Sequence, residues 1–262
     1  MSKMTSRFTR HGARPLLTAL TLFGGLLAST APSFALNVQP VVVDLQTAGR
    51  RASAIVTLQN TFPDPVPVEV TVHPVRVVDG ELREAEDQDT DDILVFPSQA
   101  TLAGNQSQAF RVQWIGEPKP GESEHFYVTI AQLPVTMAGN QNTIQVLHRF
   151  KVLVSVGSAG DAASLKLVEA KVGTDANGKP QPVVTIANDG TTYGYVANNR
   201  MTLIERRGDG SEAFRKTFEP EEIRETMGLG LVPAKASRVL PMNVELPDAT
   251  GTLSIELTPA GK

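Results

Sequence analysis

The sequence predicts an all-β fold built from two immunoglobulin-like β-sandwiches, and three observations lead to this prediction. Short segments alternate apolar and polar residues with a period of two, are rich in Val, Ile and Thr, and are separated by Pro, Gly, Asn and Asp. No window long enough for a core helix carries a clean helical stripe. The 262-residue chain also has a small, flexible stretch near its middle, and each side has about the length of one sandwich.

The period-two segments are expected to form the strands. They are residues 54–58, 67–72, 109–114, 126–133, 144–156, 165–172, 183–187, 201–205, 237–244 and 251–257. The nearest approach to a helix is the segment from Pro220 to Met227, which is expected to make one or two turns with apolar positions too sparse for the core.

Domain boundaries follow from composition. Residues 157–162, which begin Gly-Ser-Ala-Gly-Asp, are small and polar and come directly after a long apolar strand, so they are expected to be a linker. Residues 36–156 then form an N-terminal sandwich and residues 163–262 a C-terminal sandwich.

The first 35 residues have the pattern of a secretory signal peptide. A basic start precedes an apolar stretch at 16–28, and Ser33-Phe34-Ala35 provides a small-x-small cleavage site. The basic residues are Lys3, Arg7, Arg10 and Arg14. The apolar stretch is too short to span a bilayer comfortably, and no later segment is apolar enough, so we expect export without membrane insertion.

Charge and cysteine content narrow the possible functions. Removing the signal peptide changes the formal net charge from −4 to about −8, and an acidic mature chain is a poor partner for nucleic acid. Cysteine is absent, which excludes a disulfide framework, a thiolate nucleophile and Cys-ligated metal sites.

The order of several motifs resembles that of a known family. These are Ala54-Ile55-Val56-Thr57-Leu58-Gln59-Asn60, Pro67-Val68-Glu69-Val70, Val95-Phe96-Pro97-Ser98-Gln99, Phe126-Tyr127-Val128, Leu133-Pro134, Arg149-Phe150-Lys151-Val152-Leu153-Val154, Ile186-Ala187-Asn188-Asp189-Gly190 and Gly230-Leu231-Val232-Pro233. The chain is similar in these motifs to the periplasmic chaperones of the chaperone/usher pathway, which escort pilus and surface-fibre subunits.

The resemblance implies a fold and a mechanism. The two sandwiches are expected to be arranged as an L, in the periplasm, and the partners are expected to be pilus or fibre subunits and an outer-membrane usher. The chaperone of this family caps a subunit by donor-strand complementation, in which one edge strand of the chaperone completes the subunit's open sandwich. The expected lending strand is 143–156, with Ile144, Val146 and His148 on one face and Arg149 and Lys151 on the other. From periodicity alone these residues could equally fill the chain's own core.

The family also anchors the subunit's terminal carboxylate with two basic residues. Lys151 matches the one on the lending strand, with Arg149 as the weaker alternative. The other, on the opening strand, falls at Asp44 or Val42, neither of which is basic, and a further basic position of the family falls at Ser155. The resemblance therefore implies strand lending more firmly than a two-point clamp.

Signals for other chemistry are weak. Asp87-x-Asp89-x-Asp91 resembles the start of a calcium loop, but Asp92 and Ser98 stand where the loop needs Gly and Glu, so the acidic run 84–92 is expected to be a solvated hairpin loop. The mature histidines are widely spaced, Trp114 is expected to be buried in a strand, and no catalytic set emerges. We therefore expect no enzyme, no cofactor and no metal site.

Two rival functions stay open at this point. The chain could be a pilus subunit or adhesin that donates residues 37–45 to a neighbour, or an exported sandwich that binds a sugar through Trp114 or the Asp87 loop.

Overall fold

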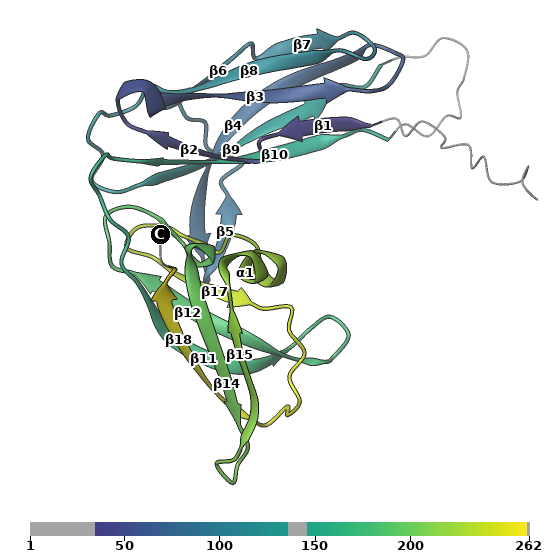
Figure 1. Cartoon of the computed structure of the whole chain (residues 1–262). Helices are drawn as coiled ribbons and strands as arrows, with labels where there is room; N and C mark the ends of the chain where they lie inside the picture. Colours follow the sequence, from purple (N-terminus) through teal and green to yellow (C-terminus); the bar gives the residue numbers. More distant parts are fainter. Residues whose placement is uncertain (1–34, 136–145, 261–262) are drawn as a thin grey trace, which may run out of the picture. The chain divides into compact units, whose positions relative to one another are not determined.

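The computed structural model describes residues 35–135 and 146–260, and these form two consecutive β-sandwiches (Figure 1). The predicted all-β fold is confirmed. Residues 1–34, which hold almost all of the predicted signal peptide, and residues 136–145, which include Ile144, lie outside the described residues. The boundaries proposed between sandwich, linker and sandwich stay predictions.

The first sandwich consists of two sheets that face each other across an apolar core. Its strands are β1 (Leu36–Gln39), β2 (Val42–Gln46), β3 (Ser53–Asn60), β4 (Val66–Val78), β5 (Glu81–Glu84), β6 (Ile93–Phe96), β7 (Gln99–Leu102), β8 (Ser107–Trp114), β9 (Glu124–Gln132) and β10 (Arg149–Gly157), and a 3-10 turn covers Gly49–Ala52. One sheet has the order β1-β3-β8-β6, and the other has the order β2-β10-β9-β4-β5, with β7 also paired to β4.

Alternation along each strand builds this core. In β3, Val56 and Leu58 are fully buried, whereas Ile55, which precedes Val56, is 53% exposed on the outer face of its sheet. Val152, Val154 and Val156 of β10 are likewise fully buried. Because side chains of a strand point alternately to its two faces, one apolar residue in two is enough to bury one face of each sheet. Trp114 is 4% exposed, as predicted.

The opening strand is divided between the two sheets. β1 pairs antiparallel with β3 in one sheet, and β2 pairs parallel with β10 in the other, so the chain crosses from sheet to sheet at Pro40 and Val41. β2 lies beside only the second half of β10, from Leu153 to Gly157. This crossing determines how much of β10 has a neighbour on both sides.

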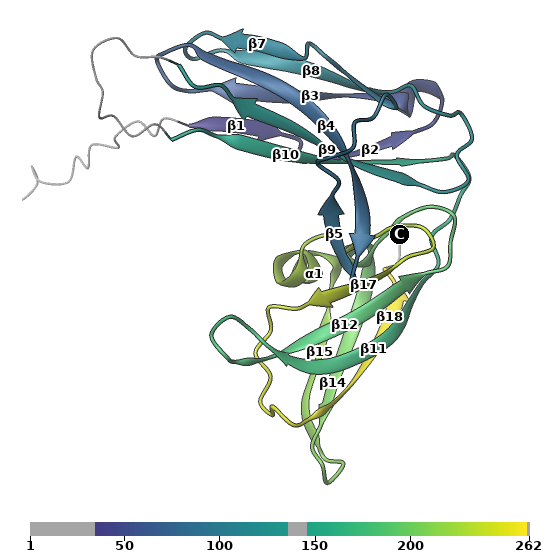
Figure 2. The ribbon, with the colours of Figure 1, turned by 180° about the vertical axis from the view of Figure 1, so that it is seen from behind.

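β4 is longer than the strand beside it. Its pairing with β9 ends at Pro74, and beyond that point Val75 to Val78 pair with β5 and with no other described strand. Figures 1 and 2 show this extension of β4 with β5 beside it. β5 ends at Glu84, which pairs with Val75.

The β4–β5 turn contains Gly80, at a φ of 80°. Its carbonyl oxygen accepts a 2.9 Å hydrogen bond from the N–H of Val239, whose side chain leaves no space for a Cβ at this position.

The second sandwich has its own core. Its strands are β11 (Leu165–Thr174), β12 (Pro180–Asn188), β13 (Gly194–Tyr195), β14 (Asn199–Arg206), β15 (Glu212–Phe218), β16 (Leu231–Val232), β17 (Ser237–Pro241) and β18 (Thr252–Pro259), and a 3-10 turn covers Val196–Asn198. The strand orders are β11-β12-β17, β13-β16 and β15-β14-β18. The core includes Ile186, Met201, Leu203 and Phe218, each fully buried.

The only α-helix in the described ranges is α1 (Pro220–Met227), which has the predicted bounds. Its first turn is stabilised by a capping box, in which the side chains of Glu219 and Glu222 each accept a backbone N–H. The expectation that it is too sparse for the core is wrong in one respect, because Ile223 is fully buried in the second core. One well-placed apolar residue anchors a helix of two turns.

Candidate functional site

The first half of β10 has a sheet neighbour on one side only. β9 pairs with β10 from Arg149 to Val156, but β2 begins to pair only at Leu153. Among the described residues, therefore, nothing pairs with the side of Arg149–Val152 that faces away from β9, and we call this segment the open edge of β10. The predicted lending strand starts later than expected, since residues 146–148 are not in a strand.

Two hydrogen bonds fix the direction of the backbone groups at the open edge. The N–H of Gln132 on β9 donates to the carbonyl of His148 at 2.9 Å, and the N–H of Leu153 donates to Val41 at 3.0 Å, on the opposite side. In an antiparallel ladder, successive residues direct their backbone groups alternately towards and away from the partner strand. Arg149 and Lys151 therefore direct their N–H and C=O groups away from β9, in the position from which a further strand would be bound.

The apolar side chains next to the open edge are only partly covered. Val146 is 73% exposed and Leu147 is 47% exposed, which is unusual for residues of this size in a folded domain. His148, the next residue along the chain, is stacked on Phe150 with ring centroids 6.2 Å apart and an interplanar angle of 11°. Its backbone N–H also donates to Oε1 of Gln132 at 3.3 Å. The predicted alternative, that Val146 is buried in the chain's own core, is wrong.

Lys151 lies at the open edge and is already paired within the chain. Its ammonium contacts Oε2 of Glu84 on β5, lies 3.9 Å from Oε1 of Glu86 and sits 5.6 Å from the centroid of the Tyr127 ring. The Lys151 side chain is 39% exposed, whereas the Glu84 side chain is 6% exposed. Arg149 is exposed and forms no ion pair with any residue in the described ranges.

Two buried polar atoms next to Lys151 lack a hydrogen-bond partner. One is Oε1 of Glu84, and the other is Oγ1 of Thr129, which lies directly opposite Lys151 in the β9–β10 ladder; neither has a partner among the described residues. Orphaned polar atoms of this kind are uncommon in native structures, and a functional role is one of the explanations for them. The expectation that Glu84 lies in a solvated loop is wrong, because β5 carries it into the sheet; Asp87, Asp89 and Asp91 are exposed as expected.

The opening strand supplies no cation at the predicted positions. Val42 pairs with Leu153 and Asp44 pairs with Ser155 in the parallel β2–β10 ladder. Asp44 instead accepts hydrogen bonds from the hydroxyl groups of Tyr193, at 2.9 Å, and Tyr195, at 2.7 Å. Burial, followed by the Asp44 carboxylate, raises the pKa of both tyrosines, so both remain neutral donors.

Ser155 belongs to a buried polar contact. Its Oγ lies 3.0 Å from Nδ1 of His125, which is 5% exposed, and the His125 ring meets the Tyr193 ring edge-on at 5.4 Å. Burial lowers the pKa of His125 to about 4, because the charged imidazolium would lose its hydration there. A neutral histidine and a serine thus occupy the place where the family resemblance suggests a basic residue.

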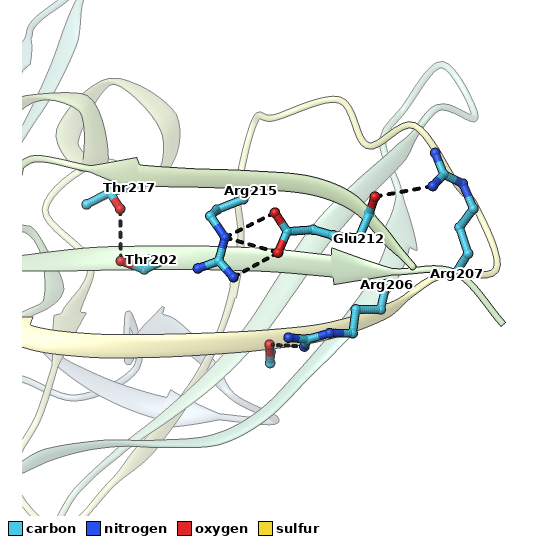
Figure 3. Close-up of polar contacts among 7 residues, drawn as sticks. Thr202, Arg206, Arg207, Glu212, Arg215 and Thr217 are labelled. Atoms are coloured by element: carbon cyan, nitrogen blue, oxygen red, sulfur yellow. Dashed lines mark hydrogen bonds and ion pairs between the residues drawn. The ribbon is translucent and has the colours of Figure 1, made fainter. Parts of the chain in front are cut away.

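The arginines at the β14–β15 hairpin of the second sandwich are bonded locally (Figure 3). Arg215 donates to both carboxylate oxygens of Glu212 at 2.8–3.1 Å. Arg207 donates to the carbonyl of Glu212 at 3.2 Å, and Arg206 donates to the hydroxyl of Ser254 at 3.4 Å. These exposed groups are bonded to one another and hold the hairpin.

Residues 35–135 and 146–260 contain no group of three His, Asp or Glu side chains placed to hold a metal ion. No helix in the same ranges is long and apolar enough to cross a membrane.

The chain is a two-domain immunoglobulin-like β-protein with an edge suited to bind a further strand. Three features define this class: the two sandwiches in sequence, the opening strand that crosses between sheets, and the open edge beside exposed apolar side chains. Residues 35–155 match the family model described as the pili and flagellar-assembly chaperone, PapD N-terminal domain. This match confirms the resemblance to chaperones of the chaperone/usher pathway, and it supports a chaperone role. No curated protein sequence matches the chain.

Solved structures agree on the fold over most of the chain. A chain of the Salmonella enterica SafA pilin complex with the SafB chaperone has a TM-score of 0.50 and 15% identity, over 88% of this chain and 98% of that one. A chain of the CsuC–CsuE chaperone–tip adhesion subunit complex from Acinetobacter baumannii Csu pili has a TM-score of 0.50 and 11% identity, over 86% and 98%. The class 5 fimbriae chaperone CfaA has a TM-score of 0.50 and 14% identity, over 86% and 100%.

The structure brings together some of the predicted site residues. Arg149 and Lys151 lie on the open edge, Val146 and His148 lie just before it, and Ile144 falls outside the described residues. Sequence reasoning missed Glu84, Thr129 and Tyr127. The approach of Glu84 to Lys151 depends on the extension of β4 beyond β9, for which the sequence carries no local signal.

Proposed function

We propose that this protein is a non-enzymatic periplasmic chaperone that binds pilus or surface-fibre subunits by donor-strand complementation and delivers them to an outer-membrane usher. The observation that carries the proposal is the open edge of β10, where Arg149 and Lys151 direct backbone groups towards a side of the sheet on which no strand of the described residues pairs with them. Export by the predicted signal peptide at 1–35 and the match to an assembly-chaperone family support the location and the class of partner.

In this proposal, β10 and the residues before it complete the sheet of an unfinished subunit. The backbone groups of the open edge provide the hydrogen bonds, and Val146 enters the hydrophobic groove of the subunit. Burying a valine side chain of this exposure contributes about 1.5–3 kcal/mol. Lys151 binds the terminal carboxylate of the subunit and so sets the register of the added strand.

The proposal that the chain is itself a pilus subunit is less well supported. In that case residues 37–45 would be donated to a neighbouring molecule. Within this chain they already form β1 and β2, which pair with β3 and β10. Donating them would break bonds in both sheets of the first sandwich.

Sugar binding by Trp114 is also poorly supported. An aromatic platform needs an exposed ring face, but Trp114 is 4% exposed, packs against Phe126 and donates its ring N–H to the carbonyl of Glu117 at 3.2 Å.

Co-purification tests the proposed function. The full chain is expressed in a Gram-negative periplasm together with each small exported protein encoded beside its gene, and complexes are isolated through a tag on the chain. We expect a stable one-to-one complex with at least one of them, and no fibres from the chain alone. Self-assembly of the purified chain into fibres would instead support the subunit hypothesis.

Substitution of Lys151 tests the anchor. Lys151→Glu should abolish recovery of the subunit while the protein stays folded by circular dichroism. Lys166→Glu is the matched control, since Lys166 is an exposed lysine on β11 that pairs with Asp189 at 2.6 Å. Normal recovery with Lys151→Glu would show that Lys151 is not the anchor.

A further inference from the structure

The charge balance around Lys151 is unfavourable for an additional anion. One ammonium group faces two carboxylates, one in direct contact from Glu84 and one 3.9 Å away from Glu86. A third carboxylate arriving from a partner would meet a net negative charge. The anchor that the proposed function needs is therefore blocked in the structure of the free chain.

The two acidic residues differ in how firmly the fold holds them. Glu84 is the last residue of β5, and its side chain is 6% exposed. Glu86 comes after the strand and its side chain is 66% exposed, so water screens its charge. The Glu84 carboxylate is the one that competes at short range for the ammonium.

The carboxylate of Glu84 also has only part of its hydrogen-bonding capacity satisfied. Only Oε2 contacts Lys151, and Oε1 is buried without a hydrogen-bond partner among the described residues. Thr129 Oγ1, directly across the ladder from Lys151, is also buried without a hydrogen-bond partner among the described residues. A buried carboxylate with one unpaired oxygen is held less favourably than a fully bonded one. Another carboxylate that satisfies Lys151 and Thr129 together can therefore displace it, provided that the Glu84 carboxylate turns into solvent and does not stay buried and unpaired.

We propose that Glu84 is an internal competitor that occupies Lys151 in the free chaperone and must release it when a subunit's terminal carboxylate binds. This inference rests on the proposed function and deepens it by naming the residue that sets the affinity for the carboxylate. Release of the subunit is then assisted from within the chaperone, because Glu84 can return to Lys151 as the carboxylate leaves.

The test compares Glu84→Gln with Glu86→Gln in the full mature chain. The probes are a synthetic peptide of alternating valine and threonine with a free carboxyl end and the same peptide with an amidated end. Glu84→Gln should bind the free-acid peptide about tenfold more tightly than the wild type and the amidated peptide equally well, whereas Glu86→Gln should change either affinity by less than about twofold. If the peptides bind, equal tightening for both of them, or no tightening for either, would overturn the inference.

A second measurement separates this inference from the proposed function. The side-chain ammonium signal of Lys151 is followed by nuclear magnetic resonance during titration with acetate, which needs no strand addition. A response in Glu84→Gln and in Glu84→Ala, but not in the wild type, supports the competitor even if no peptide binds, in which case strand lending is the claim that fails. An equal response in the wild type would overturn the competitor.

Discussion

The backbone N–H of Leu153 donates a 3.0 Å hydrogen bond to the carbonyl oxygen of Val41, and this bond marks the point where β10 acquires its second neighbour. On the C-terminal side of Leu153, β10 is an interior strand between β9 and β2. On the N-terminal side, β9 is its only neighbour among the described strands, so this half is an edge strand. A single strand thus combines a rigid half, fixed in the sheet, with a half that can accept another strand.

Proline substitution at the open edge should block strand addition without unfolding the protein. Arg149→Pro removes an N–H that points away from β9, and proline is tolerated at the start of an edge strand. We expect a free energy of unfolding within about 1 kcal/mol of the wild-type value. In the co-purification assay we expect a loss of subunit recovery.

Phe150→Pro is the matched variant with the opposite expectation. Phe150 pairs with Ile130 and directs its backbone groups towards β9, so proline there removes an interior sheet bond. It should destabilise the fold by about 1–3 kcal/mol, because the carbonyl group of β9 that it faces loses its donor. If Arg149→Pro were equally destabilising, the assigned direction of the backbone groups would be wrong.

A charge at Val146 should affect binding but not folding. Val146 is 73% exposed, so Val146→Asp buries no charge in the free protein, but it would bury one in the groove of a bound subunit. We expect loss of the subunit complex with an unchanged unfolding midpoint. Val168→Asp, at a 57% exposed position of β11, should leave both properties unchanged, and equal losses from the two variants would argue against a specific contact.

Glu205 should be a source of instability at neutral pH. It is fully buried, and neither carboxylate oxygen has a hydrogen-bond partner of normal geometry within the described residues. Burial raises the pKa of Glu205, so the folded state holds the proton more tightly than the unfolded chain and its stability falls as pH rises from about 4 through that raised pKa.

Glu205→Gln should therefore raise the free energy of unfolding by about 1–2 kcal/mol at pH 7 and by much less at pH 4, measured by urea denaturation. Glu256→Gln, at an exposed position of β18, is the control. A loss of stability at pH 7 in Glu205→Gln would mean that the ionised carboxylate has a stabilising role.

His125 should make the fold sensitive to acid. Its pKa of about 4 lies below the value of about 6.5 in an unfolded chain, so the unfolded state binds the proton first and stability falls as pH drops from about 6.5 to 4. The full effect is about 3 kcal/mol. His125→Gln, which can still bond to Ser155, should lose less stability than the wild type between pH 7 and pH 4.5 by urea titration, and parallel losses would contradict the assignment.

The predictable part of the fold is the part encoded by local pattern. The alternation at 54–58, 109–114 and 201–205 produced β3, β8 and β14, with Val56, Leu58 and Leu203 buried as the pattern requires. β15 was missed because its sequence, with Glu212, Arg215 and Lys216, reads as polar; its outer face is solvated, and only its pairing with β14 makes it a strand.

The candidate site was predictable only in part, because its decisive features are relationships between distant segments. Lys151 and Val146 could be named from the sequence. The length of the open edge depends on where β2 joins β10, and the occupation of Lys151 depends on a hairpin that ends 67 positions earlier at Glu84. Neither relationship is visible in the pattern of apolar and polar residues of the segments involved.

The crossing of the opening strand at Pro40 and Val41 has a consequence for partner choice. If the crossing came two residues earlier, β2 would extend over Lys151 and cover half of the open edge; two residues later, it would expose part of the interior half. The number of residues in β1, a strand of the opposite sheet, therefore sets the length of the segment of another protein that can pair with β10.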